Sequence, residues 1–250
     1  MRAVITGATS GIGKEMAVYL SQLGYDLILT GRNQKQLEQM QKALPTRVEI
    51  IALDLSEDRA PFQLYNFCKD KQVDLLVNNA GYGLFGTLDQ IDLEDELHML
   101  NVNIRALHIL TKLFLRDFKK RNRGRILNVA SSAGFLSGPL LSSYYASKNY
   151  VVRLTLAIYE ELRRAHSKVT VSLLCPGPVD TNFNNRAGVQ FSMPPASPKK
   201  VARYGIDGAL RGKLILIPGM GVRLGVFASR FVPHKMMSAI TYEIQKKKLK

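Results

Sequence analysis

The 250-residue sequence predicts an α/β fold, a doubly wound Rossmann-type parallel sheet of about seven strands with helices on both faces. Short, almost continuously apolar runs recur along the chain, as expected for strands buried on both faces of a parallel sheet. Stretches with helical spacing separate these runs, and the connections are short. A glycine-rich turn follows the first run. We therefore expect a single catalytic domain over residues 1–218, a length that allows one large core.

The predicted strands are rich in branched apolar residues. In chain order they are AVIT (3–6), DLILT (26–30), VEIIAL (48–53), VDLLVN (73–78), RILNVA (125–130), KVTVSLLC (168–175) and KLILIP (213–218). Helical spacing appears between them in GKEMAVYLSQLG, QKQLEQMQKAL, IRALHILTKLFLRDFKK and YVVRLTLAIYEELRRA. Only segment 182–200 breaks the alternation, and a loop of that length in a compact domain is usually functional. We expect it to be a substrate loop.

Composition argues against several classes of protein. Hydrophobic residues make up 46% of the chain, yet no apolar run approaches the roughly 20 residues of a membrane-spanning helix. The first strand begins directly after Met1 and Arg2, so we expect no signal peptide and a cytoplasmic location. Cys68 and Cys175 lie far apart without metal-ligand spacing. We expect two buried free thiols and no metal site.

The formal net charge of +15 is the unusual feature of the composition. The basic residues concentrate in KKRNRGR (119–125), SPKK (197–200) and QKKKLK (245–250). No nucleic-acid-binding motif accompanies these runs, so we expect no nucleic-acid partner. Residues 219–250 interleave apolar and basic side chains as a basic amphipathic extension. Such a segment could lie on an anionic membrane, form a homo-oligomer interface or fold back on the substrate pocket. Pro233 should divide any helix there in two.

The turn TGATSGIG contains Gly7, Gly11 and Gly13, spaced TGxxxGxG rather than GxGxxG. Glycines let a backbone turn tightly and approach a ligand, and a helix starting near Ile12 would direct its positive end at a pyrophosphate. The turn follows a strand and precedes a helix, as a dinucleotide site requires. We expect this turn, including Ser10 and Ile12, to bind a dinucleotide.

The end of the second strand indicates which dinucleotide binds. NAD sites usually place an acidic residue there for the ribose hydroxyls, whereas this chain has Gly31 followed by Arg32. A guanidinium suits a 2′-phosphate through charge-assisted hydrogen bonds. The sequence therefore predicts NADP(H) as the cofactor.

The chain resembles the short-chain dehydrogenase/reductase family in three stretches: the glycine turn TGATSGIG, NNAG at 78–81 and SSYYASK at 142–148. The match runs in order from residue 3 to about 183. The resemblance implies a catalytic asparagine, serine, tyrosine and lysine, and an aspartate, here Asp54, beside the adenine. It also implies a cofactor site containing Asn79, Ala80, Gly81, Pro176, Gly177, Val179 and Thr181.

Two adjacent tyrosines precede the lysine, and the family motif YxxxK selects Tyr144, four residues before Lys148. That spacing places both side chains on one helix face. Tyr145 lies about 100° away around the helix and is expected to pack. The resemblance assigns cofactor contacts to Tyr144 and Lys148 as well.

The spacing alone is not specific, because Tyr65 with Lys69 and Tyr242 with Lys246 also match it. The catalytic serine should lie about thirteen residues before the tyrosine, and Ser131 meets this for Tyr144 at the end of a predicted strand. No serine stands at that distance before Tyr65, and the one before Tyr242 lies beyond the last predicted strand. These contexts favour Ser131, Tyr144 and Lys148.

The family's asparagine matches Asn103 in VNI, with Asn101 as the alternative. In the expected chemistry Tyr144 donates a proton to a carbonyl oxygen that Ser131 also hydrogen-bonds. Lys148, as a nearby cation, would lower the pKa of Tyr144. The resemblance adds that Lys148 holds the nicotinamide ribose and that Asn103 anchors a water that relays protons.

The expected substrate is a small apolar carbonyl compound or the corresponding alcohol, because the candidate contacts are mostly apolar. They are Tyr82, Leu84, Phe85, Phe135, Leu136, Pro139, Leu140, Leu141, Phe183, Phe191, Met193 and Pro194. Two alternatives stay open: an NAD-dependent alcohol dehydrogenase, against which Arg32 argues, and a non-catalytic dinucleotide-binding scaffold at a membrane surface. The complete set of four catalytic residue types argues against the scaffold.

Overall fold

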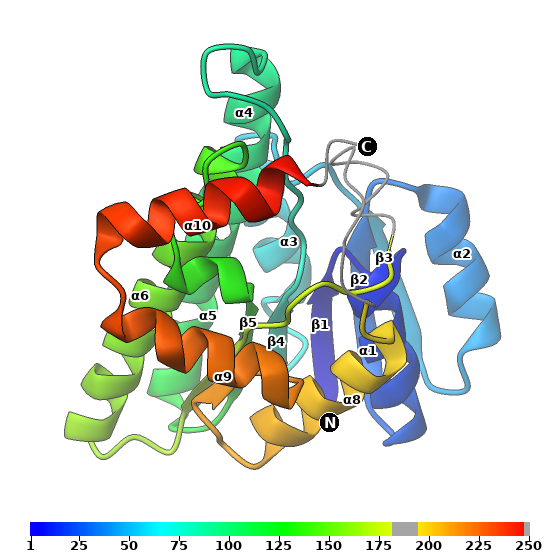
Figure 1. Ribbon diagram of the computed structural model, residues 1–250. Helices are drawn as coiled ribbons and strands as arrows, with labels where there is room; N and C mark the ends of the chain where they lie inside the picture. The colour runs from blue at the N-terminus through cyan, green and yellow to red at the C-terminus, as the bar shows by residue number, and fades with distance from the viewer. Residues whose placement is uncertain (182–194, 248–250) are drawn as a thin grey trace.

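The computed structural model describes residues 1–181 and 195–247, and at its centre lies a seven-stranded sheet (Figure 1). The strands are β1 (Arg2–Thr6), β2 (Asp26–Gly31), β3 (Val48–Ala52), β4 (Leu75–Asn78), β5 (Arg125–Val129), β6 (Thr170–Leu174) and β7 (Ile215–Leu216). They run parallel in the order β3-β2-β1-β4-β5-β6-β7. The predicted fold class is confirmed.

Helices occupy most of the connections. They are α1 (Gly11–Gln22), α2 (Gln34–Ala43), α3 (Ala60–Cys68), α4 (Leu93–Leu100), α5 (Leu107–Lys120), α6 (Ser142–Arg164), α8 (Pro198–Leu210), α9 (Met220–Ala228) and α10 (His234–Lys246). The described residues also form a π-helical turn η1 (Asn101–Ala106) between α4 and α5, a 3-10 turn η2 (Ser132–Phe135) between β5 and α6, and a 3-10 turn η3 (Ser229–Phe231) after α9. As expected, Pro233 separates two helices, α9 with its 3-10 turn from α10.

The last strand is shorter than the sequence predicted. Residues 213–218 form the apolar run, but only Ile215 and Leu216 pair with β6. The backbone N–H of Lys213 instead donates to Gly208 O at the end of α8. The start of the run therefore belongs to the turn that closes that helix.

Each face of the sheet buries its own apolar layer, as the alternation of side chains along a strand requires. On one face Ala3 and Ile5 pack with residues of α1, α2 and α8. On the other face Val4 packs with residues of α3, α5 and α6. Both cysteines are buried free thiols, as predicted. The continuously apolar strand sequences are explained by this burial on both sides.

The order of strands reverses between β1 and β4, where β2 and β3 continue to one side and β5 to β7 to the other. In open α/β sheets the crevice for ligands lies at the carboxyl ends of strands at such a point. The glycine turn follows β1 there, and residues 79–81 follow β4. Across the described ranges 1–181 and 195–247, no helix has both the length and the hydropathy to cross a membrane.

Candidate active site

The glycine turn after β1 is held against the segment after β4. Asn79 Nδ2 donates to the carbonyl oxygens of Thr6 and Gly7, at 3.0 and 3.2 Å. Gly7 has a φ of +65°, a conformation that favours glycine. A Cβ on Gly13 would lie 2.3 Å from Gly7 O and 2.4 Å from Asn79 Nδ2. Only glycine fits at residue 13, so the turn can be this close to α1.

Helix α1 begins at Gly11 with its amino end facing the turn. Within the described part of the chain, its N-cap residue Ser10 makes no side-chain hydrogen bond to the helix. Ile12 packs against the core under the turn. Backbone N–H groups at a helix amino end, together with the helix dipole, bind phosphate oxygens. The turn fits a dinucleotide pyrophosphate by its shape and by its donors.

The segment after β4 is fixed by a threonine of β1. Thr6 Oγ1 accepts hydrogen bonds from the backbone N–H groups of Asn79 and Ala80, each at 3.0 Å. Gly81 follows, and a Cβ there would lie 2.9 Å from Asn103 Oδ1 and 3.1 Å from Lys148 Nζ. Glycine at 81 therefore lets both of these side chains approach the strand end.

At the end of β2, Arg32 Nη1 lies 3.7 Å from Asp54 Oδ2, and both side chains are partly exposed. Asp54 Oδ1 also accepts from the Ser56 N–H and hydroxyl. Partial burial acts to raise the pKa of Asp54, but these hydrogen bonds and the Arg32 charge outweigh it and lower that pKa. A Cβ on Gly31 would lie 3.0 Å from the Thr9 methyl. An acidic side chain at residue 31 would crowd this corner.

The segment after β6 returns to the glycine turn. Pro176 O accepts from Ser132 N at 2.8 Å, and Gly177 leaves room for Val222 of α9. Val179 forms a parallel bridge with Ala196. The Thr181 methyl lies 2.9 Å from where a Cβ on Gly11 would be. The structure thus brings Thr181 to the amino end of α1, while Pro176 contacts the turn after Ser131.

Asn103 is fully buried in the π-helical turn between α4 and α5. Its Nδ2 donates to Tyr82 O at 2.9 Å and to Ser147 Oγ at 3.0 Å, and its Oδ1 accepts from Tyr82 N at 3.1 Å. Single π-helical turns within helices are frequent at functional sites. Because Ser147 also donates to Tyr144 O at 2.7 Å, Asn103 is connected to helix α6.

Lys148 is buried beneath the site, with Nζ donating to Val129 O at 3.1 Å and lying 5.9 Å from the centroid of the Tyr144 ring. Burial lowers the pKa of this ammonium from 10.5 to about 8, while the neighbouring Cys175 acts in the opposite direction. The strand end and helix α6 therefore enclose a lysine that releases its proton at lower pH than an exposed lysine does.

Tyr144 and Ser131 share a side-chain hydrogen bond. Burial raises the pKa of Tyr144 well above its usual range, and the Ser131 hydroxyl acts against that rise. Ser131 Oγ also accepts from Ala133 N at 3.2 Å. The pKa of Tyr144 is raised overall because burial dominates, and the expected lowering by Lys148 stays a prediction.

Tyr145 packs, as its helical phase predicted. A Cβ on Gly138 would lie 2.3 Å from its ring, so the ring rests directly on that glycine. Its hydroxyl accepts a hydrogen bond from Gln245 Nε2 of α10. Burial raises the pKa of Tyr145 to about 12. The other two YxxxK matches lie elsewhere, Tyr65 donating to Asp117 at 2.7 Å and Tyr242 exposed on α10.

The expected substrate contacts that lie in the described residues are buried or partly buried. Leu140 and Leu141 are buried just before α6, and Leu140 has a φ of +67°, unusual for a branched residue. The partly buried members are Tyr82, Leu84, Phe85, Phe135, Leu136 and Pro139. The other expected contacts, Phe183, Phe191, Met193 and Pro194, lie outside the described residues.

Sequence reasoning missed a buried polar network under the site. Asn78 Nδ2 donates to Asn128 Oδ1 at 2.9 Å and to Thr111 Oγ1 at 3.0 Å, and Asn128 Nδ2 donates to Thr155 Oγ1 at 3.0 Å. The network joins β4, β5, α5 and α6. An asparagine inside each of two apolar strand runs was the signal that could have indicated it.

Asn149 was also missed. Its Nδ2 donates to the carbonyl oxygens of Ala133, Leu136 and Tyr145, at distances of 3.3, 2.9 and 2.9 Å. One amide thus fastens the turn after Ser131 to helix α6. These hydrogen bonds therefore hold the segment after Ser131 against the helix that carries Tyr144.

Comparison with known proteins gives consistent results. A family model described as short chain dehydrogenase matches residues 1–190. A 7beta-hydroxysteroid dehydrogenase from Clostridium sardiniense is 31% identical over 203 residues, which cover 80% of this chain and 75% of that protein.

Two solved structures are also similar. A short-chain dehydrogenase from Sphingobium yanoikuyae in complex with NADPH has a TM-score of 0.82 at 25% identity, covering 92% of this chain and 93% of its own. A short chain dehydrogenase/reductase from Burkholderia phymatum in complex with NAD has a TM-score of 0.81 at 27% identity, covering 90% and 91%. By its sequence, its sheet topology and these relatives, the chain belongs to the short-chain dehydrogenase family of oxidoreductases.

Proposed function

We propose that this protein is an NADP(H)-dependent oxidoreductase that reduces a ketone or aldehyde on an apolar body, or oxidises the corresponding alcohol, with Tyr144 as the general acid/base. The observation that carries the proposal is the Ser131–Tyr144 hydrogen bond above buried Lys148, at the carboxyl end of β5. A hydroxyl pair of this kind can hydrogen-bond one substrate oxygen from two sides.

The residues around this pair fit a nicotinamide dinucleotide. The turn at Gly7, Gly11 and Gly13 would receive the pyrophosphate, with Ser10 and Ile12 at the start of α1. Arg32 would bind the 2′-phosphate and Asp54 would lie beside the adenine. The nicotinamide half would contact Asn79, Ala80, Gly81, Tyr144, Lys148, Pro176, Gly177, Val179 and Thr181. When bound, the cofactor supplies or accepts the hydride.

The protein's own groups handle the proton. In reduction, Tyr144 gives its hydroxyl proton to the substrate oxygen as negative charge develops there, and Ser131 donates a hydrogen bond to the same oxygen. Burial of Tyr144 disfavours the resulting tyrosinate, so a positive charge must accompany proton loss. Lys148 in its protonated form would provide that charge, and Asn103 would connect the lysine to solvent through a water.

The preference for an apolar substrate rests on the described contacts before α6 and on the hydroxysteroid dehydrogenase relative. Leu140 and Leu141 border Tyr144 in sequence and are buried. We extend the proposal to segment 182–200 as a substrate loop within a catalytic domain of residues 1–218. The extension 219–250 would complete the substrate side, and the protein would act in the cytoplasm.

The proposal is tested by titrating purified protein with NADPH and with NADH while following nicotinamide fluorescence. We expect NADPH to bind more tightly by at least about tenfold, because a guanidinium–phosphate contact contributes roughly 1.5–3 kcal/mol. Apolar ketones, including oxosteroids, are then screened with the preferred cofactor. Equal affinity would favour an NAD-linked alcohol dehydrogenase; the similar structure from Burkholderia phymatum is in complex with NAD. Binding without turnover of any carbonyl would contradict the reductase proposal.

A further inference from the structure

Helix α10 buries two polar residues while it exposes three large apolar ones. Thr241 and Gln245 are 4% and 1% exposed, whereas Met236, Ile240 and Ile244 are 52%, 42% and 49% exposed. A surface helix of a globular protein normally shows the opposite arrangement, with its apolar stripe toward the core. The outer face of α10 therefore has the composition of a face that meets an apolar environment.

The inner contacts of α10 determine which face points outward. Gln245 Nε2 donates to the Tyr145 hydroxyl, and Ser238 Oγ lies 2.6 Å from Ser137 Oγ. Both contacts join α10 to the substrate side of the domain. Turning the apolar stripe inward would move Gln245 to the outer face and break both hydrogen bonds, which would leave the Tyr145 hydroxyl without its donor. The exposure of the stripe is built into the fold.

Helix α9 and the 3-10 turn after it extend the same kind of surface. Met220, Leu224, Phe227 and Phe231 follow one another at helical spacing, and Leu224 and Phe231 are 60% and 74% exposed. The Phe227 and Phe231 rings contact edge to face, with centroids 5.4 Å apart. Val226 points inward and is buried. In Figure 1, α9 and α10 run along the same side of the molecule, joined by the turn at residues 229–233.

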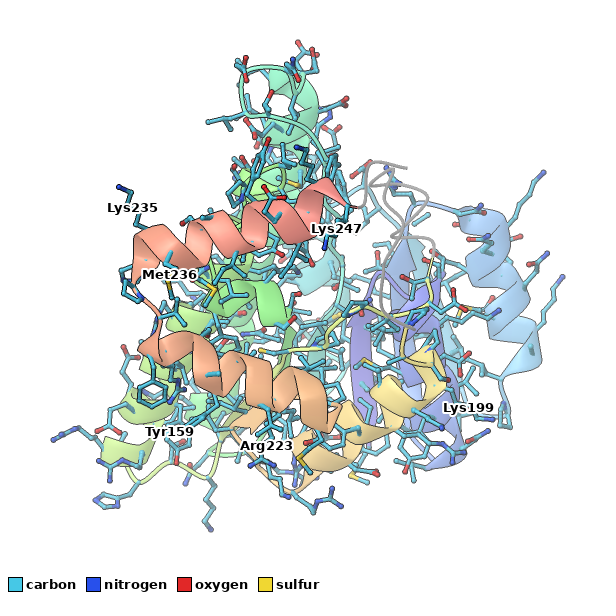
Figure 2. The ribbon with its side chains drawn as sticks, viewed as in Figure 1. Tyr159, Lys199, Arg223, Lys235, Met236 and Lys247 are labelled. Atoms are coloured by element: carbon cyan, nitrogen blue, oxygen red, sulfur yellow. The ribbon has the colours of Figure 1, made fainter. Side chains whose placement is uncertain are left out.

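We call the outer faces of residues 220–247 the α9–α10 surface, and its charge is strongly positive. Five basic residues accompany the apolar stripe against a single acidic one, Glu243: Arg223, Arg230, Lys235, Lys246 and Lys247. Figure 2 shows Lys235 and Lys247 at opposite ends of α10 and Arg223 on α9. Cations thus frame the apolar residues at their edges.

We propose that the α9–α10 surface binds an anionic lipid bilayer. Interfacial helices insert an apolar face to the level of the acyl chains while lysine and arginine contact the headgroups. A second copy of the chain fits this surface less well. A twofold contact would bring the same basic residues of both copies together, with one glutamate from each copy to offset them. This inference does not depend on the proposed catalytic function, since it concerns a different surface.

Co-sedimentation of the full-length protein with vesicles tests the proposal. One set contains phosphatidylcholine alone and the other about one third phosphatidylglycerol, which supplies the negative surface charge. We expect binding to the anionic set that weakens as salt increases. The inactive variant Tyr144→Phe should bind as well as the wild type, which separates this result from any failure of the catalytic proposal.

Paired variants with matched controls identify the surface. Phe231→Ser with Ile240→Ser should lower the partition coefficient by about tenfold or more, since each buried apolar side chain contributes roughly 1.5–3 kcal/mol. The control pair Phe62→Ser with Leu93→Ser removes side chains of similar exposure, 44% and 65%, from α3 and α4 and should leave binding unchanged.

A second double variant, which reverses two positive charges, repeats the comparison. Lys235→Glu with Lys247→Glu should lower partitioning by about tenfold or more, at roughly 1 kcal/mol for each basic residue at the bilayer surface. Lys168→Glu with Lys213→Glu, exposed residues just before β6 and β7, should have no such effect.

Light scattering and thermal melts accompany each variant to record assembly and folding. No binding to anionic vesicles would overturn the proposal, and so would equal losses in the test and control pairs. A dimer that dissociates on Phe231→Ser with Ile240→Ser, without vesicle binding by the wild type, would assign the surface to a second copy instead.

Discussion

The rings of Tyr144 and Tyr145 stand nearly perpendicular, with an interplanar angle of 76° and centroids 6.1 Å apart. One residue of helical rotation separates their environments. Tyr144 hydrogen-bonds Ser131, whereas Tyr145 packs on Gly138 and accepts a hydrogen bond from Gln245. Two identical side chains, adjacent in sequence, therefore have different predicted tasks, and removing each hydroxyl separately tests this division.

Tyr144→Phe should lower turnover by about 10²- to 10⁴-fold, the usual contribution of a positioned acid or base, while cofactor binding is retained. Tyr145→Phe should keep most of the turnover. It should instead lower the free energy of unfolding by about 1–3 kcal/mol, because the buried Gln245 amide loses its acceptor. Steady-state kinetics and urea unfolding measure the two effects. Full activity in Tyr144→Phe would refute the assignment of Tyr144 as the acid.

Burial of Lys148 should make stability depend on pH in the absence of cofactor. Its pKa is lowered from 10.5 to about 8, so the unfolded chain binds more protons between these values and stability rises with pH through this window. The free energy of unfolding of Lys148→Met, relative to that of the wild type, should therefore be most favourable at low pH. When the pH is lowered from about 10 to about 7, the difference in the free energy of unfolding between variant and wild type should shift by up to about 3 kcal/mol in favour of the variant.

Urea unfolding of both proteins at the two pH values checks this, and the comparison cancels the pH-independent loss of the hydrogen bond to Val129 O. A shift in the opposite direction would mean that the folded protein favours the charged lysine.

Arg32→Gln should weaken NADPH binding by about ten- to a hundredfold, because the contact with the 2′-phosphate is lost. NADH binding should change little. Removing the arginine also takes away the positive charge 3.7 Å from the Asp54 carboxylate, so that this carboxylate repels a phosphate more strongly. Arg47→Gln is the matched control, an exposed arginine at the amino end of the neighbouring strand β3, whereas Arg32 follows the carboxyl end of β2. Equal weakening of both cofactors by Arg32→Gln would contradict a role in their discrimination.

Gly13→Ala should destabilise the protein by about 1–3 kcal/mol and disrupt cofactor binding, because its Cβ would meet Gly7 O and Asn79 Nδ2 at 2.3 and 2.4 Å. Gly225→Ala in α9 is the control, with no atom within 4 Å of the added Cβ. It should stabilise the protein by up to about 1 kcal/mol through helix propensity. Thermal melts and fluorescence titration measure both variants, and a tolerated Gly13→Ala would argue against the close approach at the turn.

The sheet was predictable because its strands are buried on both faces, so that each leaves an unbroken apolar run in the sequence. Helix α4 was not predicted, although Asp92 caps it by accepting from the N–H groups of Glu94 and Asp95. Its mostly exposed residues give little periodicity. The rise in the Tyr144 pKa was not predicted, because the sequence shows the neighbouring lysine but not the burial of the tyrosine hydroxyl.

The contact between Gln245 and Tyr145 joins residues a hundred positions apart. No local pattern signals it, since neither residue type is unusual in its own helix. The same holds for the inward polar face of α10, which depends on what lies beneath the helix. The candidate catalytic residues were predicted from motifs, whereas the contacts that support them required the three-dimensional structure.

Residues 93–120 keep a helical backbone through α4, η1 and α5, and the π-helical turn lies between the two α-helices. Such a turn is equivalent to one residue inserted into an α-helix. Deleting one residue from 101–106 would let residues 93–120 continue as a regular α-helix with both halves in their present directions, but would remove the widened turn that carries Asn103. Asn103 could not then reach Tyr82 and Ser147 together. A shortened chain would gain a more regular helix and lose the asparagine from the site.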